Sequence, residues 1–281
     1  MRRIALLLLT LVPIALFAAA CGDDSDSSSG GSGSGANAST DEPLRVGASP
    51  VPHAEILNFV AKDLAPKAGL KLEVKEFSDY VLPNTALNDG QLDANYFQTP
   101  AYLKDQAKAR GLDLVSIVGV HIEPLGIYSR KHDDLAKVPN GAKVAIPNDA
   151  TNENRALQLL AANQLLTLKD GATENATVRD IADNPKDLDF EEVDAAQTAR
   201  ALDDVDLAVI NGNYALENDL KPADDALALE QAEGNPNANL LVTLGKDKDD
   251  PRVKKLAELL TSPEVKAFIE DKYQGAVLPA F

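Results

Sequence analysis

From residue 44 onward, short apolar runs alternate with longer segments in which apolar residues recur at helical spacing. A few apolar residues bounded by turn-forming residues fit a buried strand, and such runs occupy residues 44–48, 70–77, 112–120, 125–130, 143–147, 189–193, 206–210, 226–230 and 239–245. Helical spacing covers residues 52–64, 83–90, 100–111, 151–162, 198–205, 213–219, 251–261 and 263–273. Regular alternation of this kind predicts an α/β fold with mostly parallel sheets, arranged as two lobes.

Residues 142–160, AKVAIPNDATNENRALQLL, predict a strand, a turn and a helix. Thr151 is expected to be the helix N-cap, since its hydroxyl can accept from a free backbone amide. Arg155 then falls in or just after the first turn, where the helix end carries partial positive charge. An arginine there is favourable only beside an anion, which predicts either a bound ligand anion or, as alternatives, an ion pair with an acid such as Glu153 or contact with solvent.

The N-terminus reads as a processing signal. MRR precedes an apolar run of 17 residues that ends in small residues directly before Cys21, the only cysteine. This arrangement resembles the lipobox of bacterial lipoproteins, so we expect a signal peptide over residues 1–20 and a lipidated Cys21. Residues 21–43 are rich in Ser, Gly and Asp and have no apolar run, which predicts a disordered tether between a membrane anchor and the folded body.

Composition and motifs narrow the function. The net charge is −17 and no basic cluster longer than a pair occurs, so nucleic acid is not expected as a partner. The sequence has no G-x-x-x-x-G-K-[ST], G-x-S-x-G or H-E-x-x-H motif. Its three histidines, His53, His121 and His132, are dispersed without metal-ligand spacing. We therefore expect no catalysis, no metal and no cofactor, and core or solvated histidines.

Aromatic residues gather in one part of the chain. Phe77, Tyr80, Tyr96, Phe97 and Tyr102 fall within 26 residues. Filling a core is one interpretation for any of them. Tyr80, however, follows a strand in a loop, and Phe97 and Tyr102 flank the loop at QTP, positions that suit the wall of a pocket.

Five segments give a specific resemblance. SDYVLPNTAL, GQLDANYFQTPAYL, AIPNDATNENR, DLAVINGNYA and NPNANLLV, in this order, resemble the NlpA family of methionine-binding lipoproteins, the substrate-binding components of methionine ABC importers. The resemblance covers residues 44–281. It implies a periplasmic-binding-protein-like clamshell with a hinge, in which residues 44–126 plus 238–281 form lobe I and residues 127–237 form lobe II. It also implies a protein anchored by lipid on the extracytoplasmic face of the cell membrane, with a permease and separate ATPase subunits as partners.

The resemblance also implies roles for individual residues. Arg155, with Asn152 beside it, would hold the ligand carboxylate. Tyr80, Phe97 and Tyr102 would surround the thioether, because polarizable sulfur makes favourable contacts with aromatic rings. Asn211 and Asn239 would bind the amino and carboxylate groups of the ligand; turn formation at strand ends is the alternative for both.

Two departures leave the ligand open. Many family members carry histidine two positions after the pocket phenylalanine, where this chain has Thr99, and NPNAN replaces the tyrosine commonly found before the last asparagine. A methionine-containing dipeptide, another apolar amino acid or a small sulfonate are therefore alternatives to methionine. A cell-surface interaction lipoprotein and an extracytoplasmic hydrolase are alternatives to a transport role.

Overall fold

The computed structural model describes residues 42–281. The predicted signal peptide, the predicted lipidation at Cys21 and the predicted tether up to residue 41 lie outside the described residues. Among the helices of residues 42–281, none combines the length and the apolar character needed to cross a bilayer.

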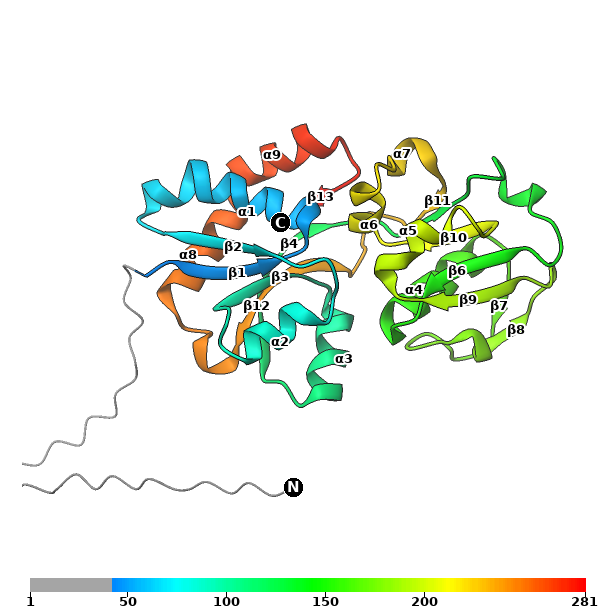
Figure 1. Cartoon of the computed structure of the whole chain (residues 1–281), viewed down its shortest axis with the longest axis horizontal. Coiled ribbons are helices and arrows are strands. Elements are labelled where there is room, and N and C mark those ends of the chain that lie inside the picture. The colour runs from blue at the N-terminus through cyan, green and yellow to red at the C-terminus, as the bar shows by residue number, and fades with distance from the viewer. Residues whose placement is uncertain (1–41) are drawn as a thin grey trace, which may run out of the picture. The chain divides into compact units, whose positions relative to one another are not determined.

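The first large sheet has six strands in the order β13-β4-β12-β3-β1-β2. Its strands are β1 (Leu44–Ala48), β2 (Leu72–Glu76), β3 (Ala94–Gln98), β4 (Leu114–Ile122), β12 (Ala238–Leu244) and β13 (Leu278–Pro279). Its helical segments are η1 (Pro50–Ala54), α1 (Glu55–Phe59), η2 (Val60–Leu64), η3 (Ala65–Ala68), α2 (Leu82–Asn88), α3 (Pro100–Arg110), η7 (Gly245–Asp247), α8 (Pro251–Leu260) and α9 (Pro263–Tyr273). We call this sheet with its helices lobe I (Figure 1).

The second large sheet has five strands in the order β11-β5-β10-β6-β9. Its strands are β5 (Gly126–Tyr128), β6 (Lys143–Pro147), β9 (Asp189–Val193), β10 (Leu207–Ile210) and β11 (Ala226–Leu229). It is accompanied by η4 (Leu135–Lys137), α4 (Ala150–Ala162), the hairpin β7 (Thr167–Leu168) and β8 (Ile181–Asp183), η5 (Val178–Asp180), η6 (Ala195–Gln197), α5 (Thr198–Ala201), α6 (Gly212–Glu217) and α7 (Pro222–Asp225). We call this sheet with its helices lobe II, and the predicted two-lobed α/β architecture is confirmed.

The chain passes between the two sheets at residues 123–125, from β4 to β5, and at residues 230–237, from β11 to β12. Strand β4 runs toward the first crossing and β12 runs away from the second, so the two strands pair antiparallel. Four of the ten strand pairings are parallel and six are antiparallel. The prediction of mostly parallel sheets is therefore wrong, because alternation along the chain does not record the direction in which a returning strand enters a sheet. The predicted lobe boundaries stay a prediction.

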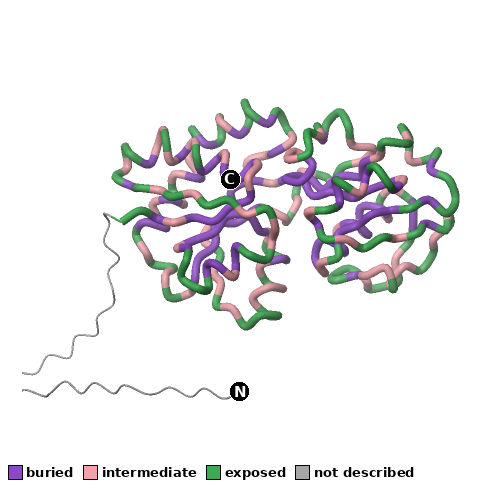
Figure 2. The backbone as a smooth tube through the Cα atoms, in the orientation of Figure 1, coloured by how far each residue is buried: buried purple, intermediate pink, exposed green. Residues whose placement is uncertain are grey.

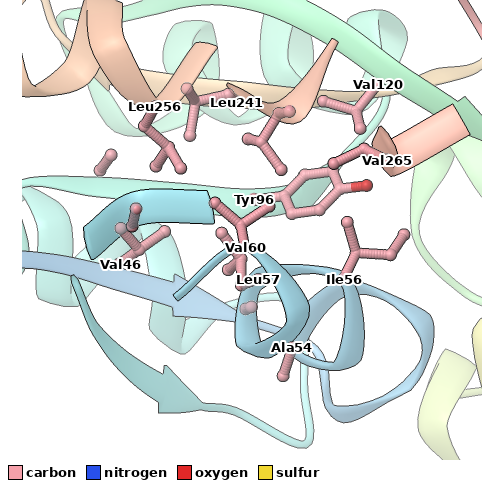
Figure 3. Packing of buried hydrophobic residues seen from close by; sticks show 14 of the residues in the cluster. Val46, Ala54, Ile56, Leu57, Val60, Tyr96, Val120, Leu241, Leu256 and Val265 are labelled. Atoms are coloured by element: carbon pink, nitrogen blue, oxygen red, sulfur yellow. The ribbon is translucent and has the colours of Figure 1, made fainter. Parts of the chain in front are cut away.

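Strand periodicity places a core on both faces of each sheet, since successive side chains point to opposite faces. In β12, Leu241 joins the cluster that includes α1, α8 and α9, whereas Leu240 and Val242 join the cluster under α2. Figure 3 shows the first of these cores, where residues of the predicted helix 52–64, among them Ile56 and Leu57, pack against the other elements. Buried residues lie along the central strands of both sheets and on the helices that cover them (Figure 2).

Candidate ligand-binding site

A small cavity of about 30 Å³, partly open to solvent, lies between the two lobes. This volume is far below the roughly 300–1,000 Å³ of typical small-molecule pockets, so the walls of the cavity lie close together. Its lining residues are Tyr80, Phe97, Gln98, Thr99, Tyr102 and Asn239 from lobe I, Glu123 from the first crossing, and Asn152, Arg155, Asn211, Gly212 and Asn213 from lobe II. All eight residues predicted to form a ligand site thus lie around one cavity.

One end of the cavity is aromatic. The ring centroids of Tyr80, Phe97 and Tyr102 lie 5.8–6.0 Å apart in all three pairs, and Tyr214 lies 5.0 Å from Tyr80. The Tyr102 hydroxyl donates to the Tyr80 carbonyl at 3.0 Å, which fixes the loop before α2 against α3. The Tyr80 hydroxyl donates to Asn213 Oδ1 in lobe II at 2.5 Å. All three rings line the cavity, and their contact with a ligand stays a prediction.

Helix α4 brings Asn152 and Arg155 to the cavity. Its N-cap is Asp149 and not Thr151 as predicted: the Asp149 carboxylate accepts from the Asn152 backbone N–H at 3.0 Å and from the Thr151 hydroxyl at 3.0 Å. A carboxylate is favoured over a hydroxyl at this position because it also meets the positive helix end. With the helix starting at Ala150, Arg155 lies in the second turn and reaches out from the helix.

The Arg155 guanidinium forms an ion pair that the sequence did not indicate. Its Nε donates to Glu230 Oε1 at 3.0 Å and its Nη2 to Glu230 Oε2 at 2.6 Å. The alternative of a pair with Glu153 is wrong, because Glu153 instead accepts from the Val178 backbone N–H at 2.9 Å. Burial lowers the pKa of Arg155, but Glu230 more than offsets this, so the guanidinium stays charged.

Two guanidinium N–H groups of Arg155 remain for a ligand. An arginine has five N–H donors, of which two bind Glu230 and one, on Nη1, reaches Asn152 Oδ1 at 3.4 Å. One N–H is left on each of Nη1 and Nη2. A carboxylate can therefore still bind along the edge of the guanidinium that faces away from Nε.

Asn211 lies at the N-terminus of α6 and offers an acceptor. Its Nδ2 donates to Asn152 Oδ1 at 2.9 Å, which fixes the orientation of the amide. Its Oδ1 is buried and has no hydrogen-bond partner within the described chain. A buried carbonyl oxygen without a partner costs on the order of 1–3 kcal/mol, so this atom is suited to accept from a ligand N–H.

Glu123 is the one acidic side chain of the cavity wall, and the sequence analysis missed it. Burial raises its pKa to about 7, although His53, Arg155 and the Asn213 backbone N–H favour the charged form. Helix α6 starts directly against it: a Cβ on Gly212 would lie 2.7 Å from the Glu123 Cβ, so glycine is needed there. Its position directly after a strand, in HIEP, was the only sequence feature that could have suggested it.

Two histidines support this wall from inside lobe I. His121 Nε2 lies 2.6 Å from Glu123 Oε1, its Nδ1 bonds to the Tyr96 hydroxyl, and His53 Nε2 donates to Asn239 Oδ1 at 3.0 Å. The bond from His53 leaves the Asn239 N–H₂ as the group that can donate to a ligand. His53 and His121 are buried, as one of the predicted alternatives states, but they are not dispersed in space.

His53, His121 and Glu123 have nitrogen and oxygen atoms within 4.8 Å of one another, and these are atom types that can bind a metal ion. Ligands of a tetrahedral zinc ion at 2.0–2.2 Å lie about 3.3 Å apart. The 2.6 Å between His121 Nε2 and Glu123 Oε1 is shorter than that and is a hydrogen-bond length. The described arrangement is that of a hydrogen-bonded cluster.

Gln98 and Thr99 complete the wall at the end of β3. Gln98 is buried and exchanges hydrogen bonds of 2.8–3.0 Å with Asn84 and Asn95, so its amide is fixed beneath the cavity. Thr99 occupies the N-cap position of α3 without a capping side-chain bond. Its short side chain is part of the cavity wall.

Comparison with known proteins gives a consistent result. The family model "NlpA lipoprotein" matches residues 44–281. The chain is 41% identical over 238 residues to the methionine-binding lipoprotein MetQ of Bacillus subtilis (strain 168), covering 83% of this chain and 86% of that one. It is 42% identical over 227 residues to the D-methionine-binding lipoprotein MetQ of Escherichia coli (strain K12), covering 80% and 82%. A nutrient binding protein from Burkholderia cenocepacia, solved bound to methionine, superimposes with a TM-score of 0.82 at 49% identity, covering 85% and 100%.

Proposed function

The chain belongs to the NlpA lipoprotein family, and we propose that it is a solute-binding protein that captures methionine between its lobes for an ABC importer. Relatives named as methionine-binding lipoproteins and a methionine-bound structural neighbour support the ligand. The observation that carries the proposal is the composition of the cavity wall, which joins a cluster of rings to one arginine, one carboxylate and several amides.

The polar end of the cavity matches both charges of an amino acid. The free edge of Arg155 and the N–H₂ of Asn239 bind the carboxylate. Glu123 and the unpaired Oδ1 of Asn211 accept from the ammonium group. Glu230 already neutralises the charge of Arg155. The carboxylate of Glu123 therefore favours a zwitterion, which brings an ammonium group, over an anion such as a sulfonate.

The aromatic end accepts the side chain. Contacts between a thioether and a ring contribute roughly 0.3–1.5 kcal/mol each, and Tyr80, Phe97 and Tyr102 surround one space. Rejection of leucine is weaker, since a difference of one group in an apolar pocket is worth about 1–3 kcal/mol.

Binding from both lobes drives closure. Tyr80, Phe97, Tyr102 and Asn239 belong to lobe I, whereas Arg155 and Asn211 belong to lobe II, so a ligand contacts all of them only when the lobes are together. This difference in contacts favours the closed form, which the importer recognises.

We further propose that a permease with separate ATPase subunits is the partner and that a lipid on Cys21 holds the protein at the extracytoplasmic membrane surface. We assign no catalytic role. The twelve residues of the cavity wall include no serine, cysteine, lysine or histidine, and their one acid, Glu123, is proposed to accept from the ligand ammonium.

The test is calorimetric titration of the protein in detergent after bound ligand has been removed by unfolding and refolding. Methionine is expected to bind with at least tenfold higher affinity than leucine, a methionine-containing dipeptide or methanesulfonate. If the dipeptide binds more tightly than methionine, the proposed ligand becomes a larger molecule that uses the space at Thr99. Binding of none of the four would reject the proposal in favour of a cell-surface interaction role.

A further inference from the structure

Glu230 does not line the cavity, yet its carboxylate accepts four hydrogen bonds. Oε1 accepts from Arg155 Nε at 3.0 Å, and Oε2 accepts from Arg155 Nη2 at 2.6 Å, from the Leu125 backbone N–H at 3.0 Å and from Asn235 Nδ2 at 3.3 Å. A carboxylate has about four lone-pair positions. With four donors bound and no place in the cavity wall, Glu230 can influence a ligand only through its partners.

These partners join three segments. Arg155 belongs to α4, Leu125 to the first crossing, and Glu230 and Asn235 to the second. The Glu230 backbone N–H also donates to the Leu125 carbonyl at 2.9 Å, so the two crossings are bonded to each other by main chain as well as side chain. The guanidinium at the cavity is thereby attached to both connections between the lobes.

The ion pair between Arg155 and Glu230 is largely buried, so each charge depends on the other. The side chains of Arg155 and Glu230 are 11% and 14% exposed. Removing one member of a buried pair is costly because the other charge loses its partner, whereas a pair with all its hydrogen bonds made is held in one geometry. Since Glu230 takes the Nε–Nη2 edge, the Nη1–Nη2 edge is the one that remains for a ligand carboxylate.

We infer that Glu230 is a positioning residue for the ligand carboxylate, holding the Arg155 guanidinium so that its Nη1–Nη2 edge meets that carboxylate. The inference rests on the proposed function and deepens it. It states that recognition of the acid group depends on a residue that the ligand does not touch.

The experiment compares methionine with methioninol, which keeps the thioether and the amino group but has a hydroxymethyl group in place of the carboxylate. In Glu230→Gln the amide offers one oxygen and places an N–H₂ against the guanidinium. Affinity for methionine is expected to fall at least tenfold, and affinity for methioninol to change less than twofold. In the Arg155→Lys variant, the additional change Glu230→Gln is expected to lower methionine affinity by less than a further threefold. The guanidinium that Glu230 orients is already absent from that variant.

The chain offers a matched control. Asp93 binds Arg45 through the same two donors, Nε at 3.1 Å and Nη2 at 3.0 Å, in lobe I and away from the cavity wall. Asp93→Asn is expected to bind methionine within twofold of the wild type. If Glu230→Gln does not fold, Glu230→Asp, which keeps the charge but is shorter by one methylene, is titrated in the same way with the same expected pattern.

Two outcomes overturn the inference: wild-type affinity for methionine in the Glu230 variant, or an equal loss for methionine and methioninol, which indicates a general structural effect. Failure of the proposed function looks different, since the wild-type protein itself would then not bind methionine.

Discussion

The Tyr80 hydroxyl donates a hydrogen bond of 2.5 Å to Asn213 Oδ1 and so connects lobe I to lobe II at the cavity. The same tyrosine contributes its ring to the aromatic end of the cavity. Tyr80 thus serves both the proposed contact with the ligand side chain, through its ring, and the contact between the lobes, through its hydroxyl. Removing only the hydroxyl separates the two.

Tyr80→Phe keeps the ring and removes the interlobe bond. A hydrogen bond contributes about 0.5–1.5 kcal/mol net, so methionine affinity is expected to fall by roughly two- to tenfold, while the ratio of methionine to leucine affinity stays the same. Calorimetry measures both. Tyr273→Phe is the control, because that hydroxyl donates to Glu55 Oε2 at 2.6 Å within lobe I. Unchanged affinity in Tyr80→Phe would show that the bond does not contribute to closure.

Arg155→Lys keeps the positive charge and removes the planar fork. A single ammonium cannot bind Glu230 on one edge and a carboxylate on the other, so methionine affinity is expected to fall by more than 2 kcal/mol, about thirtyfold. Titration of the variant checks this, with Arg45→Lys in lobe I as the comparison. A loss below about tenfold would remove Arg155 from its proposed role.

Asp149→Ala tests the link between a helix cap and the site. Loss of an N-cap costs about 1 kcal/mol of unfolding free energy, measured by urea denaturation. Asp149 also accepts from Asn152 Nδ2 at 2.9–3.0 Å, so methionine affinity is expected to fall about threefold or more as that amide loses its orientation. Ser262→Ala removes the cap of α9, whose hydroxyl accepts from the Val265 N–H, and should cost similar stability without affecting affinity. Equal affinities in the two variants would contradict the link.

Local patterns predicted most of the elements and the residues of the cavity wall. Strand β6 and helix α4 appear where VAIP and the leucine spacing place them, and Arg155 and Asn211 both line the cavity. These features depend on neighbours within a few residues or on a motif that the chain shares with relatives.

The features that were missed depend on contacts between distant segments. Glu230 meets Arg155 from 75 residues away, and His53 meets Asn239 from 186 residues away. The antiparallel pairing of β12 with β4 depends on how the chain returns to lobe I. Glu123 follows a strand as many solvated acids do, and only the approach of α6 at Gly212 makes it buried.

The buried Glu123 also predicts a pH dependence, and the groups around it determine how that should be measured. His121 faces it from β4, His53 from η1, Arg155 from α4, and Glu217 from α6. Burial lowers the pKa of His53 to about 4 and that of His121 to about 3. Below pH 6.5 the unfolded chain therefore binds protons that the folded protein does not, and the free energy of unfolding decreases as the pH falls. The raised pKa of Glu123 acts oppositely: its contribution is present at low pH and is lost as the pH rises toward 7. These effects oppose each other in an unfolding experiment, so ligand affinity is the better measurement.

In the empty cavity Glu123 is protonated below its pKa of about 7, and only its carboxylate form can accept from the ligand ammonium. Binding must then release the proton, so methionine affinity is expected to fall by up to about tenfold per pH unit below 7 and to level off above it. Calorimetry between pH 5.5 and 8.5 tests this. Glu123→Gln should bind weakly with a flat profile. Glu217, whose pKa burial also raises to about 7, is not in the cavity wall, so Glu217→Gln should keep the slope. A flat profile in the wild type would mean that the ammonium group has another partner.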